Sequence, residues 1–433
     1  MRYIGYLITL IVTSLYFFPF EFSFLPGVNT KMAMAVLGLI LAVYSCAKNR
    51  SIGLPKEYIW VFLLALLTSF WGIASTTYNS TNDYTYASYF VSMSVWLGGA
   101  FFVIQSIRFF HGRADAELVC NYLIAVCVAQ CGLALVIDQI PVAKAFVDSF
   151  LGGSGFMGKS ESRLYGIGCS LDVAGTRFCA VLIMAAEMIS RSRGRKLILY
   201  VLSFFFLTVV GNMIARTTTV GVFLAIFYLL LRTVFFSKNL VDGRKSWAIM
   251  GVFFVLTTVL VLFLYNISPV FKAYFRFAFE GFFSLVETGQ WKVSSNDILK
   301  SMVVFPDNTR TWLIGDGYFD NPTSDPYYIG YLWKGFYQGT DIGYLRFIFY
   351  FGLTGLFLFI GYFLSVARYC CTLFPKRKMF FDMLLLILFV VWCKVSSDIF
   401  SIFAIFFIGK DLLSDESDSE TNVLEHSAAT ATD

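Results

Sequence analysis

The chain has 433 residues, of which 58% are hydrophobic and only 14% are charged, and its formal net charge is +5. A soluble domain is about one quarter charged, so this composition excludes an ordinary globular domain. A helix that crosses a bilayer needs about 20 consecutive apolar residues, and such runs follow one another along nearly the whole chain. The sequence therefore predicts an all-α integral membrane protein that has the lipid bilayer as a partner.

Twelve apolar runs indicate about twelve transmembrane helices, so the predicted protein is multi-pass. The runs cover residues 3–20, 30–47, 57–75, 86–107, 117–138, 171–190, 196–214, 217–236, 246–266, 341–368, 380–395 and 398–411. The last two runs are short, and a single helix could account for both. No small-residue cleavage site follows the first run, so we expect a retained span there rather than a signal peptide.

The short loops on one side of this arrangement are rich in lysine and arginine. With twelve spans, both termini and five basic clusters fall on the same side; the clusters read KNRS, RFFHGR, RSRGRK, SKNLVDGRK and PKRK. Basic loops face the cytoplasm, so we expect a bacterial inner (cytoplasmic) membrane protein with both termini in the cytoplasm. This topology explains the net positive charge, which therefore does not indicate a nucleic-acid partner.

The cysteine and histidine residues indicate no metal or cofactor. The nine cysteines include no C-x-x-C pair. His111 and His426 both fall on the predicted cytoplasmic side, so a histidine-based zinc site on the outer face is not expected. We expect a protein that uses neither a metal nor a cofactor.

The predicted spans divide the chain into four parts. Residues 1–266 hold the first nine spans, with a periplasmic loop near 139–170. Residues 267–340 form one large periplasmic loop, and residues 341–411 hold the C-terminal spans. Residues 412–433 are acidic and polar, which is typical of a disordered cytoplasmic tail.

The large loop begins with a segment, VFKAYFRFAFEGFFSLVE, in which polar side chains recur among aromatic ones. Lys272, Arg276, Glu280 and Ser284 follow at four-residue spacing. This pattern predicts an amphipathic helix lying flat on the outer leaflet, as a membrane anchor or as a contact for a substrate lipid. The next polar segment, SSNDILKS, predicts a short capped helix.

The end of the large loop is rich in glycine, proline and aromatic residues. The segment GDGYFDNPTSDPYYIGYLWKG has no helical periodicity and predicts an ordered loop. Tyr318, Tyr327, Tyr328 and Trp333 could stack on sugars there. They could equally be aromatic residues of the membrane interface.

Four arginines fall at or just inside the predicted outer boundary of the membrane: Arg163, Arg177, Arg216 and Arg346. An arginine at the centre of a membrane helix costs roughly 2.5–3.5 kcal/mol on insertion scales, and less near the interface. Any one of them could reach the headgroups or form a structural ion pair. A polyanion at this boundary would satisfy all four, and the planar guanidinium suits phosphate oxygens well.

Asp341 precedes an apolar run and has three interpretations. It could cap the following helix, or it could pair with Arg346. It could also accept a proton from a sugar hydroxyl as a general base. Asp316 and Glu161 are alternative candidates for that catalytic role.

The layout resembles the superfamily of Wzy-type O-antigen polymerases and O-antigen ligases. The resemblance rests on IARTTTVG at a helix junction, on RLYGIG followed by AGTRF, and on the large loop that ends in GDGYF and TDIGYLRFIFYFG. By layout it covers most of the chain. It implies a metal-independent glycosyltransferase that acts on undecaprenyl-diphosphate-linked oligosaccharides at the periplasmic face of the inner membrane.

The resemblance also assigns roles to residues. Arg177 and Arg216 match the family's diphosphate-binding arginines best, with Arg163 as a third, and we expect Asp341 to be catalytic with Arg177 and Arg216. The expected substrate-binding residues are Arg163, Arg346, Tyr344, Asp316, Tyr318 and Trp333. The ligase branch carries a histidine in its large loop, and residues 267–340 contain none, which favours a polymerase of O-antigen, capsule or exopolysaccharide. A chain-length regulator and a flippase are implied partners.

Two alternatives remain at this point. One is an O-antigen ligase-type glycan transferase. The other is a flippase or transporter, because about twelve spans is a common transporter count. A transporter would carry repeats and a site near the membrane midplane, whereas the charged residues here gather at the predicted outer boundary.

Overall fold

The structure is a computed structural model that describes residues 2–49, 56–151, 163–235, 240–326, 328–333 and 335–408. Within these ranges the chain forms helices, loops and two isolated β-bridges, and no strand, so the all-α prediction is confirmed. Glu161, Tyr327 and the tail 412–433 lie outside the described residues.

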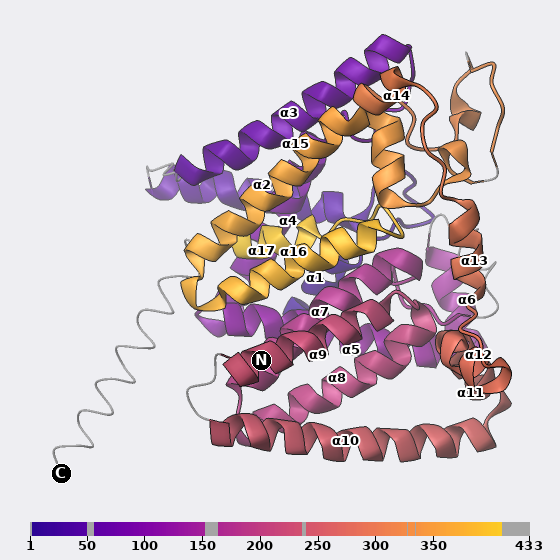
Figure 1. Ribbon diagram of the computed structural model, residues 1–433. Helices are drawn as coiled ribbons and strands as arrows, with labels where there is room; N and C mark the ends of the chain where they lie inside the picture. The colour runs from indigo at the N-terminus through magenta and orange to yellow at the C-terminus, as the bar shows by residue number, and fades with distance from the viewer. Residues whose placement is uncertain are drawn as a thin grey trace.

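Figure 1 shows the helices in their arrangement. The α-helices are α1 (Arg2–Phe17), α2 (Thr30–Asn49), α3 (Lys56–Asn79), α4 (Tyr89–His111), α5 (Ala116–Gln139), α6 (Pro141–Phe150), α7 (Leu171–Arg191), α8 (Gly194–Ile214), α9 (Thr218–Phe235), α10 (Leu240–Ile267), α11 (Pro269–Ala278), α12 (Glu280–Thr288), α13 (Ser294–Ser301), α14 (Thr309–Leu313), α15 (Gly343–Leu373), α16 (Lys378–Trp392) and α17 (Phe400–Phe407). Short 3₁₀ helices are η2 (Pro322–Ser324), η3 (Tyr337–Gly339) and η4 (Pro375–Arg377).

Among the described residues, eight helices are long and apolar enough to cross a membrane: α3, α4, α5, α7, α8, α9, α10 and α15. This finding confirms the membrane class. Helices α1 and α2 coincide with the first two predicted runs and have shorter apolar stretches. The count of twelve spans and the periplasmic position of the large loop stay predictions.

The last two predicted runs form two separate helices. Helix α16 has 15 residues and α17 has 8, and residues 393–399 between them are not helical. A helix of 15 residues is about 22 Å long, which is less than the thickness of a hydrocarbon core. Non-helical backbone at membrane depth needs protein around it. Helix α17 itself is enclosed by the bundle, since all its residues from Phe400 to Phe407 are buried.

The loops and the basic segments lie at opposite ends of the helix bundle. In Figure 1, α6 and α11–α13 lie at the right, where α5 and α10 end, and we call this side the loop end. At the other end, Arg191 donates to the carbonyl oxygen of Lys376 at 2.7 Å, and Lys196 pairs with Glu117 at 2.9 Å. We call this side the basic end.

Both limits of the described chain lie at the basic end. Tyr6 of α1 stacks on His111 at the end of α4, with ring centroids 4.2 Å apart. Tyr58 at the start of α3 donates to the carbonyl oxygen of Phe407, 2.7 Å away. The described chain thus begins and ends at the basic end, and the cytoplasmic position of the termini stays a prediction.

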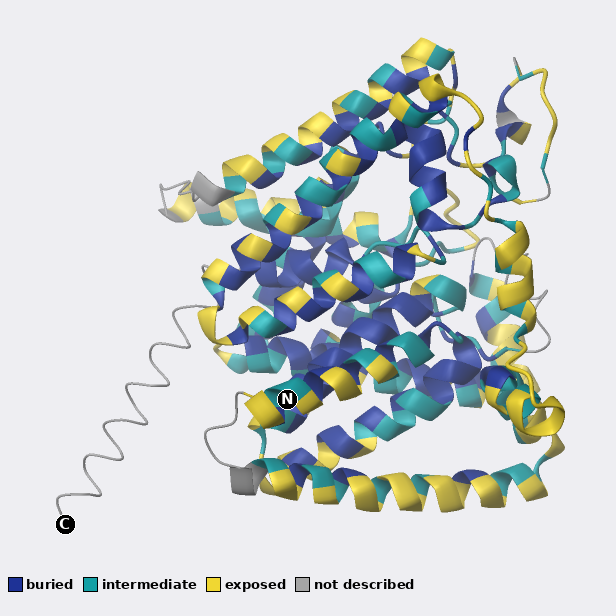
Figure 2. Cartoon of the chain, in the orientation of Figure 1, coloured by how far each residue is buried: buried dark blue, intermediate teal, exposed yellow. Residues whose placement is uncertain are grey.

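Helix α7 is the centre of the bundle and α10 is at its edge. In the most apolar stretch of α7, 89% of the residues are buried inside the protein, against 11% in the corresponding stretch of α10. Figure 2 shows the same contrast, with α10 exposed along most of its length and a buried core around α7. Because the exposed side chains of α10 are apolar, that face suits contact with lipid tails.

Helix α15 consists of two parts that meet at Phe351 and Gly352, whose backbone is not helical. The break leaves backbone carbonyl groups without helical partners, and other segments bind them. The amides of Asp316 and Gly317 donate to the carbonyls of Phe349 and Tyr350 at 2.6 and 3.1 Å. In Gly352 a φ of +68° puts the backbone where a side chain would be strained. The loop end is therefore anchored to the bundle at this break.

Two expectations for the large loop need correction. The segment predicted as one amphipathic helix forms two, α11 and α12, which meet at Phe279. The predicted short helix is confirmed as α13, but its predicted cap is wrong. Val293 occupies the N-cap position, and its aliphatic side chain cannot make a capping hydrogen bond. The hydroxyl of Ser294 donates to Glu280 instead.

Candidate functional site

Arg216 lies in a tight turn that joins α8 to α9 at the loop end. Three residues separate the helices, and the hydroxyls of two threonines donate hydrogen bonds to residues in the last turn of α8. Thr218 donates to the carbonyl of Gly211 at 3.1 Å, and Thr219 bonds to the side chain of Asn212 at 2.6 Å. These hydrogen bonds from the threonines of the IARTTTVG segment stabilise the turn. The side chain of Arg216 projects from it.

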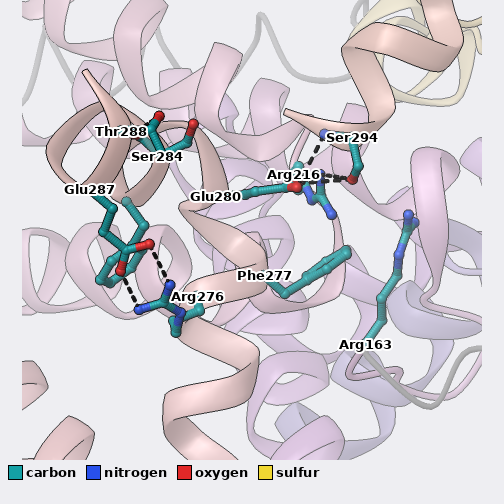
Figure 3. A pocket seen from close by; sticks show the side chains of 10 residues that line it. Arg163, Arg216, Arg276, Phe277, Glu280, Ser284, Glu287, Thr288 and Ser294 are labelled. Carbon is teal, nitrogen blue, oxygen red and sulfur yellow. Dashed lines mark hydrogen bonds and ion pairs between the residues drawn. The ribbon is translucent and has the colours of Figure 1, made fainter. Parts of the chain in front are cut away.

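Arg216 projects into a cavity of about 630 Å³ under α11 and α12 (Figure 3). Its guanidinium carbon lies 3.9 Å from the centre of the Phe277 ring, and that of Arg163 lies 4.9 Å from the same ring. Burial lowers the pKa of Arg216, the charge of Glu280 opposes this shift, and the nearby charge of Arg163 lowers the pKa further. Two of the four predicted arginines therefore share one cavity and one aromatic ring.

The carboxylate of Glu280 occupies the position to which the donors of this cavity point. One oxygen lies 2.5 Å from Nη1 of Arg216 and accepts from the hydroxyl of Ser294 at 3.0 Å. The other accepts from the backbone amide of Ser294 at 3.2 Å, at the first residue of α13. A guanidinium, a hydroxyl and a helix N-terminal amide are together the donors typical of an oxyanion or phosphate site.

Arg276 also lines this cavity, but a carboxylate already neutralises it. Its guanidinium lies 2.7 Å from Glu287 and donates to the hydroxyl of Tyr265 at 3.3 Å. Both partners belong to the same group of helices, α10 to α12. Arg276 therefore joins these helices, while Arg163 and Arg216 supply the cationic wall of the cavity.

A second group of charged side chains adjoins Arg216 through the next residue. The hydroxyl of Thr217 donates to Asp172 at 3.0 Å and accepts from Lys394 at 3.0 Å, and Lys394 lies 3.5 Å from Asp172. These three residues come from the α8–α9 turn, the start of α7 and the non-helical segment after α16. The arrangement extends the charged surface from Arg216 toward the centre of the bundle.

Sequence analysis missed Lys394 and Asp172. Lys394 is the only basic residue in the run 380–395, and a charge in an apolar run is itself a signal of function. Asp172 precedes Arg177 by five positions in a segment read for its arginine alone. Their pairing across 222 positions could not be read from sequence spacing.

Arg346 occupies an enclosed position on the first part of α15. Its guanidinium lies between the rings of Phe319 and Phe336, at 3.6 and 3.7 Å from their centres. It pairs with Asp320 at 2.7 Å and with Asp341 at 3.7 Å, and only 5% of its side chain is exposed. The arginine is therefore saturated by groups of the protein itself.

Asp341 is not the cap of α15. The N-cap residue is Ile342, which makes no side-chain hydrogen bond, so the capping interpretation is wrong. The carboxylate instead faces Arg346, with 26% of its side chain exposed. Burial raises the pKa of Asp341 to about 6, while the charges of Arg346 and Lys394 act in the opposite direction. A carboxylate with this pKa is suited to accept a proton near neutral pH.

Arg177 lies apart from Arg216, among aromatic residues in the first part of α7. Its guanidinium carbon is 5.5–5.9 Å from the rings of Phe17, Phe18 and Trp96, and its side chain is buried. One guanidinium nitrogen has no hydrogen-bond partner among the described residues. Asp398, in the segment between α16 and α17, is close enough for its charge to act on Arg177.

The four predicted arginines thus occupy three surroundings rather than one. Arg163 and Arg216 share a cavity, and Arg346 is enclosed by aromatic rings and carboxylates. Arg177 is buried among aromatic side chains inside the bundle. A single phosphate group cannot contact all of them in this arrangement. The expectation that one polyanion satisfies all four is therefore replaced by a narrower one that concerns the cavity of Arg163 and Arg216.

Asp316 and Tyr344 have structural partners. The carboxylate of Asp316 accepts from Thr311 at 2.6 Å, from Arg310 at 3.1 Å and from Tyr337 at 3.1 Å. The hydroxyl of Tyr344 donates to the carbonyl of Phe389 at 3.0 Å and so joins α15 to α16. These contacts hold the loop end together and leave Asp316 poorly placed to replace Asp341 as a base.

Tyr318 and Trp333 belong to an aromatic cluster in the large loop. The Tyr318 hydroxyl donates to Asp325 at 2.7 Å, and Trp333 packs edge-on against Tyr337 with ring centroids 4.8 Å apart. Tyr318 also lines a cavity of about 230 Å³ together with Asp83 and other polar residues. The sugar-binding role of Tyr318 and Trp333 stays a prediction.

Comparisons with known proteins identify no relative: no family, no curated protein and no solved structure matches this chain. Among the described residues, no group of three or more histidine, cysteine, aspartate or glutamate side chains is arranged to hold a metal ion.

Proposed function

We propose that this protein is a glycosyltransferase that joins lipid-diphosphate-linked oligosaccharide repeat units into a polysaccharide. The observation that carries the proposal is the cavity of Arg163 and Arg216, where three kinds of donor, a guanidinium, a hydroxyl and a backbone amide, converge on the carboxylate of Glu280. Such a position suits a phosphate group, and it lies at the end of a membrane bundle, beside the mostly apolar and exposed helix α10.

The donor substrate in this proposal is anchored by its lipid and recognised by its diphosphate. The side chains of α10 offer an apolar surface that leads to the cavity, since α10 is followed directly by α11 and α12. A guanidinium binds two phosphate oxygens at once, and Arg216 with Arg163 would oppose the negative charge of the diphosphate. The same cations would stabilise the charge that develops on the leaving diphosphate.

Asp341 is the proposed general base. It accepts the proton of an acceptor hydroxyl as the hydroxyl oxygen forms a bond to the anomeric carbon of the donor sugar. The bond from that carbon to the diphosphate oxygen breaks, and the lipid diphosphate leaves. The raised pKa of Asp341 supports this role, and Lys394 and Asp172 are charged groups within electrostatic reach of its carboxylate.

The substrate and its location follow from the resemblance described above. We propose undecaprenyl-diphosphate-linked oligosaccharides as donor and acceptor, a periplasmic loop end and a cytoplasmic basic end. The product would be a surface polysaccharide such as O-antigen, capsule or exopolysaccharide. A flippase would supply the substrate, and a chain-length regulator would act on the same polymer.

A second candidate function is transport, which one observation favours. Residues 393–399 interrupt the last two helices inside the bundle, and the interruption carries Lys394 and Asp398. Interrupted helices with charged residues are typical of transporter binding sites. The polymerase remains the better supported function because the cavity of Arg216 lies at the loop end rather than at mid-bundle.

Deletion of the gene, followed by electrophoresis of the surface glycan, tests the proposal. We expect single repeat units in place of a ladder of long chains, and restoration of the ladder by the wild-type chain. An unchanged ladder would contradict a role in polymerisation. Accumulation of lipid-linked repeats on the cytoplasmic side would instead support transport.

A further inference from the structure

Helices α2 and α4 pack closely together at Gly38 and Gly98. A methyl group added at Gly38 would overlap the backbone carbonyl of Gly98, and one at Gly98 would lie 3.0 Å from the carbonyl of Ala35. Small residues allow membrane helices to approach in this way. One turn farther toward the basic end α2 carries a larger side chain, that of Leu41.

A groove of about 590 Å³ lies between the two helices at the basic end. It is lined from α2 by Leu41, Tyr44, Ser45 and Lys48, and from α4 by Phe102, Gln105, Ser106, Arg108, Phe109 and Phe110. Positions three and four apart lie on the same face of a helix, so each helix presents one continuous side to the groove. The groove is open, since Tyr44 and Phe109 are 65% and 81% exposed.

The lining of the groove changes from apolar to cationic along its length. Leu41 and Phe102 lie on the side nearer the close contact at Gly38, and Lys48 and Arg108 lie nearer the helix ends. Hydroxyl and amide groups of Ser45, Ser106 and Gln105 lie between these levels, and none of the described residues that line the groove is acidic. Cations at the helix ends with apolar side chains below them match a phosphate headgroup above an acyl chain.

We propose that this groove binds one anionic phospholipid, with its phosphate at Lys48 and Arg108 and an acyl chain along Leu41 and Phe102. Basic pockets between membrane helices recognise lipid headgroups in this way. The site lies at the end of the bundle opposite the cavity of Arg216, so the proposal does not depend on the enzymatic function. It assigns part of the charge at the basic end to lipid recognition rather than to orientation alone.

The simpler explanation is that Lys48 and Arg108 only orient the helices, as basic loop residues commonly do. The two explanations differ in what they require. Orientation depends on charge at the helix ends, whereas lipid binding depends on charge and on an open groove. A variant that fills the groove without changing its charge therefore separates them.

The test uses the full-length protein in detergent, titrated with phosphatidylglycerol, with retained lipid counted by native mass spectrometry. We expect one retained molecule and at least tenfold weaker retention of phosphatidylcholine. Lys48→Gln combined with Arg108→Gln should weaken retention about thirtyfold, since each cation near the surface contributes about fivefold. Ser106→Trp, which fills the groove and keeps its charge, should also weaken retention.

The control removes two positive charges at the same end outside the groove. Arg113 and Lys196 are 63% and 68% exposed and pair with Asp115 and Glu117. Arg113→Gln combined with Lys196→Gln should leave lipid retention unchanged. Equal retention of phosphatidylcholine, equal thermal stabilisation by inorganic phosphate, or undiminished retention by Ser106→Trp would each overturn the proposal.

Discussion

Arg216 and Arg346 occupy similar places in the sequence, each beside an apolar run at the predicted outer boundary, but their surroundings differ. Arg346 is clamped between two aromatic rings and paired with two aspartates. Arg216 stacks on one ring, pairs with one glutamate and borders a cavity of about 630 Å³. We infer that an arginine at this boundary is available to a ligand only where the protein's own groups do not fully compensate its charge.

The comparison assigns different tasks to the two residues. Arg346 holds the first part of α15 against the large loop and lies 3.7 Å from Asp341, whereas in the proposed function Arg216 exchanges Glu280 for a phosphate. Loss of Arg346 should then be measured mainly in stability, and loss of Arg216 mainly in substrate binding and turnover. Measurements on variants of both regions can test this assignment of tasks to Arg216 and Arg346.

The largest expected effect belongs to Asp341, which lies between the two regions. Asp341→Asn keeps the size of the side chain but cannot accept a proton, so polymerisation should slow by about 10²–10⁴-fold. The lipid-linked donor should still bind, because the cavity of Arg216 is unchanged. Chain growth on purified lipid-linked repeats, followed by electrophoresis, measures the rate. Wild-type turnover in this variant would remove Asp341 from the mechanism.

The pH dependence of turnover provides a second measurement on Asp341. Its pKa is raised to about 6, so the carboxyl becomes protonated and inactive as a base when the pH falls through 6. Turnover of the wild type should therefore fall about tenfold for each unit below that pH and level off above it. The residual activity of Asp341→Asn should lack this transition. A wild-type profile without a transition between pH 5 and 7 would contradict the assignment.

Arg216 is expected to have the next largest effect. Arg216→Ala should reduce turnover by about 10²–10³-fold, comparable to the loss of one donor to a developing negative charge. Arg216→Lys should recover only part of it, since an ammonium group cannot bind two phosphate oxygens as a planar fork does. Thermal unfolding in detergent should change little in either variant. Arg276→Lys is the control at the same cavity, because Glu287 already neutralises that position.

Arg346 should show the reverse pattern. Arg346→Met removes the charge and leaves the partly buried Asp341 without its cation, whereas Asp320 is 62% exposed and stays hydrated, so the free energy of unfolding should fall by about 1–3 kcal/mol. Binding of undecaprenyl diphosphate to the protein that remains folded should be close to wild type. Thermal unfolding and a binding titration on the same sample measure both quantities. A stable variant that fails to bind would place Arg346 with Arg216.

The smallest effect is expected for Glu280, and its sign is opposite. Glu280→Gln keeps an acceptor for Ser294 but removes the negative charge opposite Arg216. A partly exposed ion pair contributes about 0.2–1 kcal/mol, so undecaprenyl diphosphate should bind about two- to fivefold more tightly. The matched control is Glu287→Gln, which alters the ion pair of Arg276 in the same cavity and should not tighten binding. Weaker binding by Glu280→Gln would show that Glu280 supports the ligand rather than occupying its place.

The sequence alone determined the class of the protein and the position of most helices. Runs of apolar residues long enough to cross a bilayer specify helices whatever their neighbours are, because unpaired backbone groups are too costly in hydrocarbon. The local pattern of polar residues likewise predicted helix α13 at residues 294–301. The arginines at the predicted boundary were found from their positions beside apolar runs. These features depend on residues close together in the chain, which is why they could be read from it.

Tertiary structure alone decided which charges meet and where helices break. Glu280 lies 64 positions from Arg216, and Lys394 lies 177 positions from Thr217. No local sequence pattern could therefore predict either contact. Likewise α15 breaks at Phe351 because the loop at Asp316 and Gly317 supplies amides for the carbonyls that the break leaves unpaired. An arginine's cost at a membrane boundary is fixed by its own chemistry, but whether a glutamate, a pair of rings or a ligand compensates it depends on packing between distant segments.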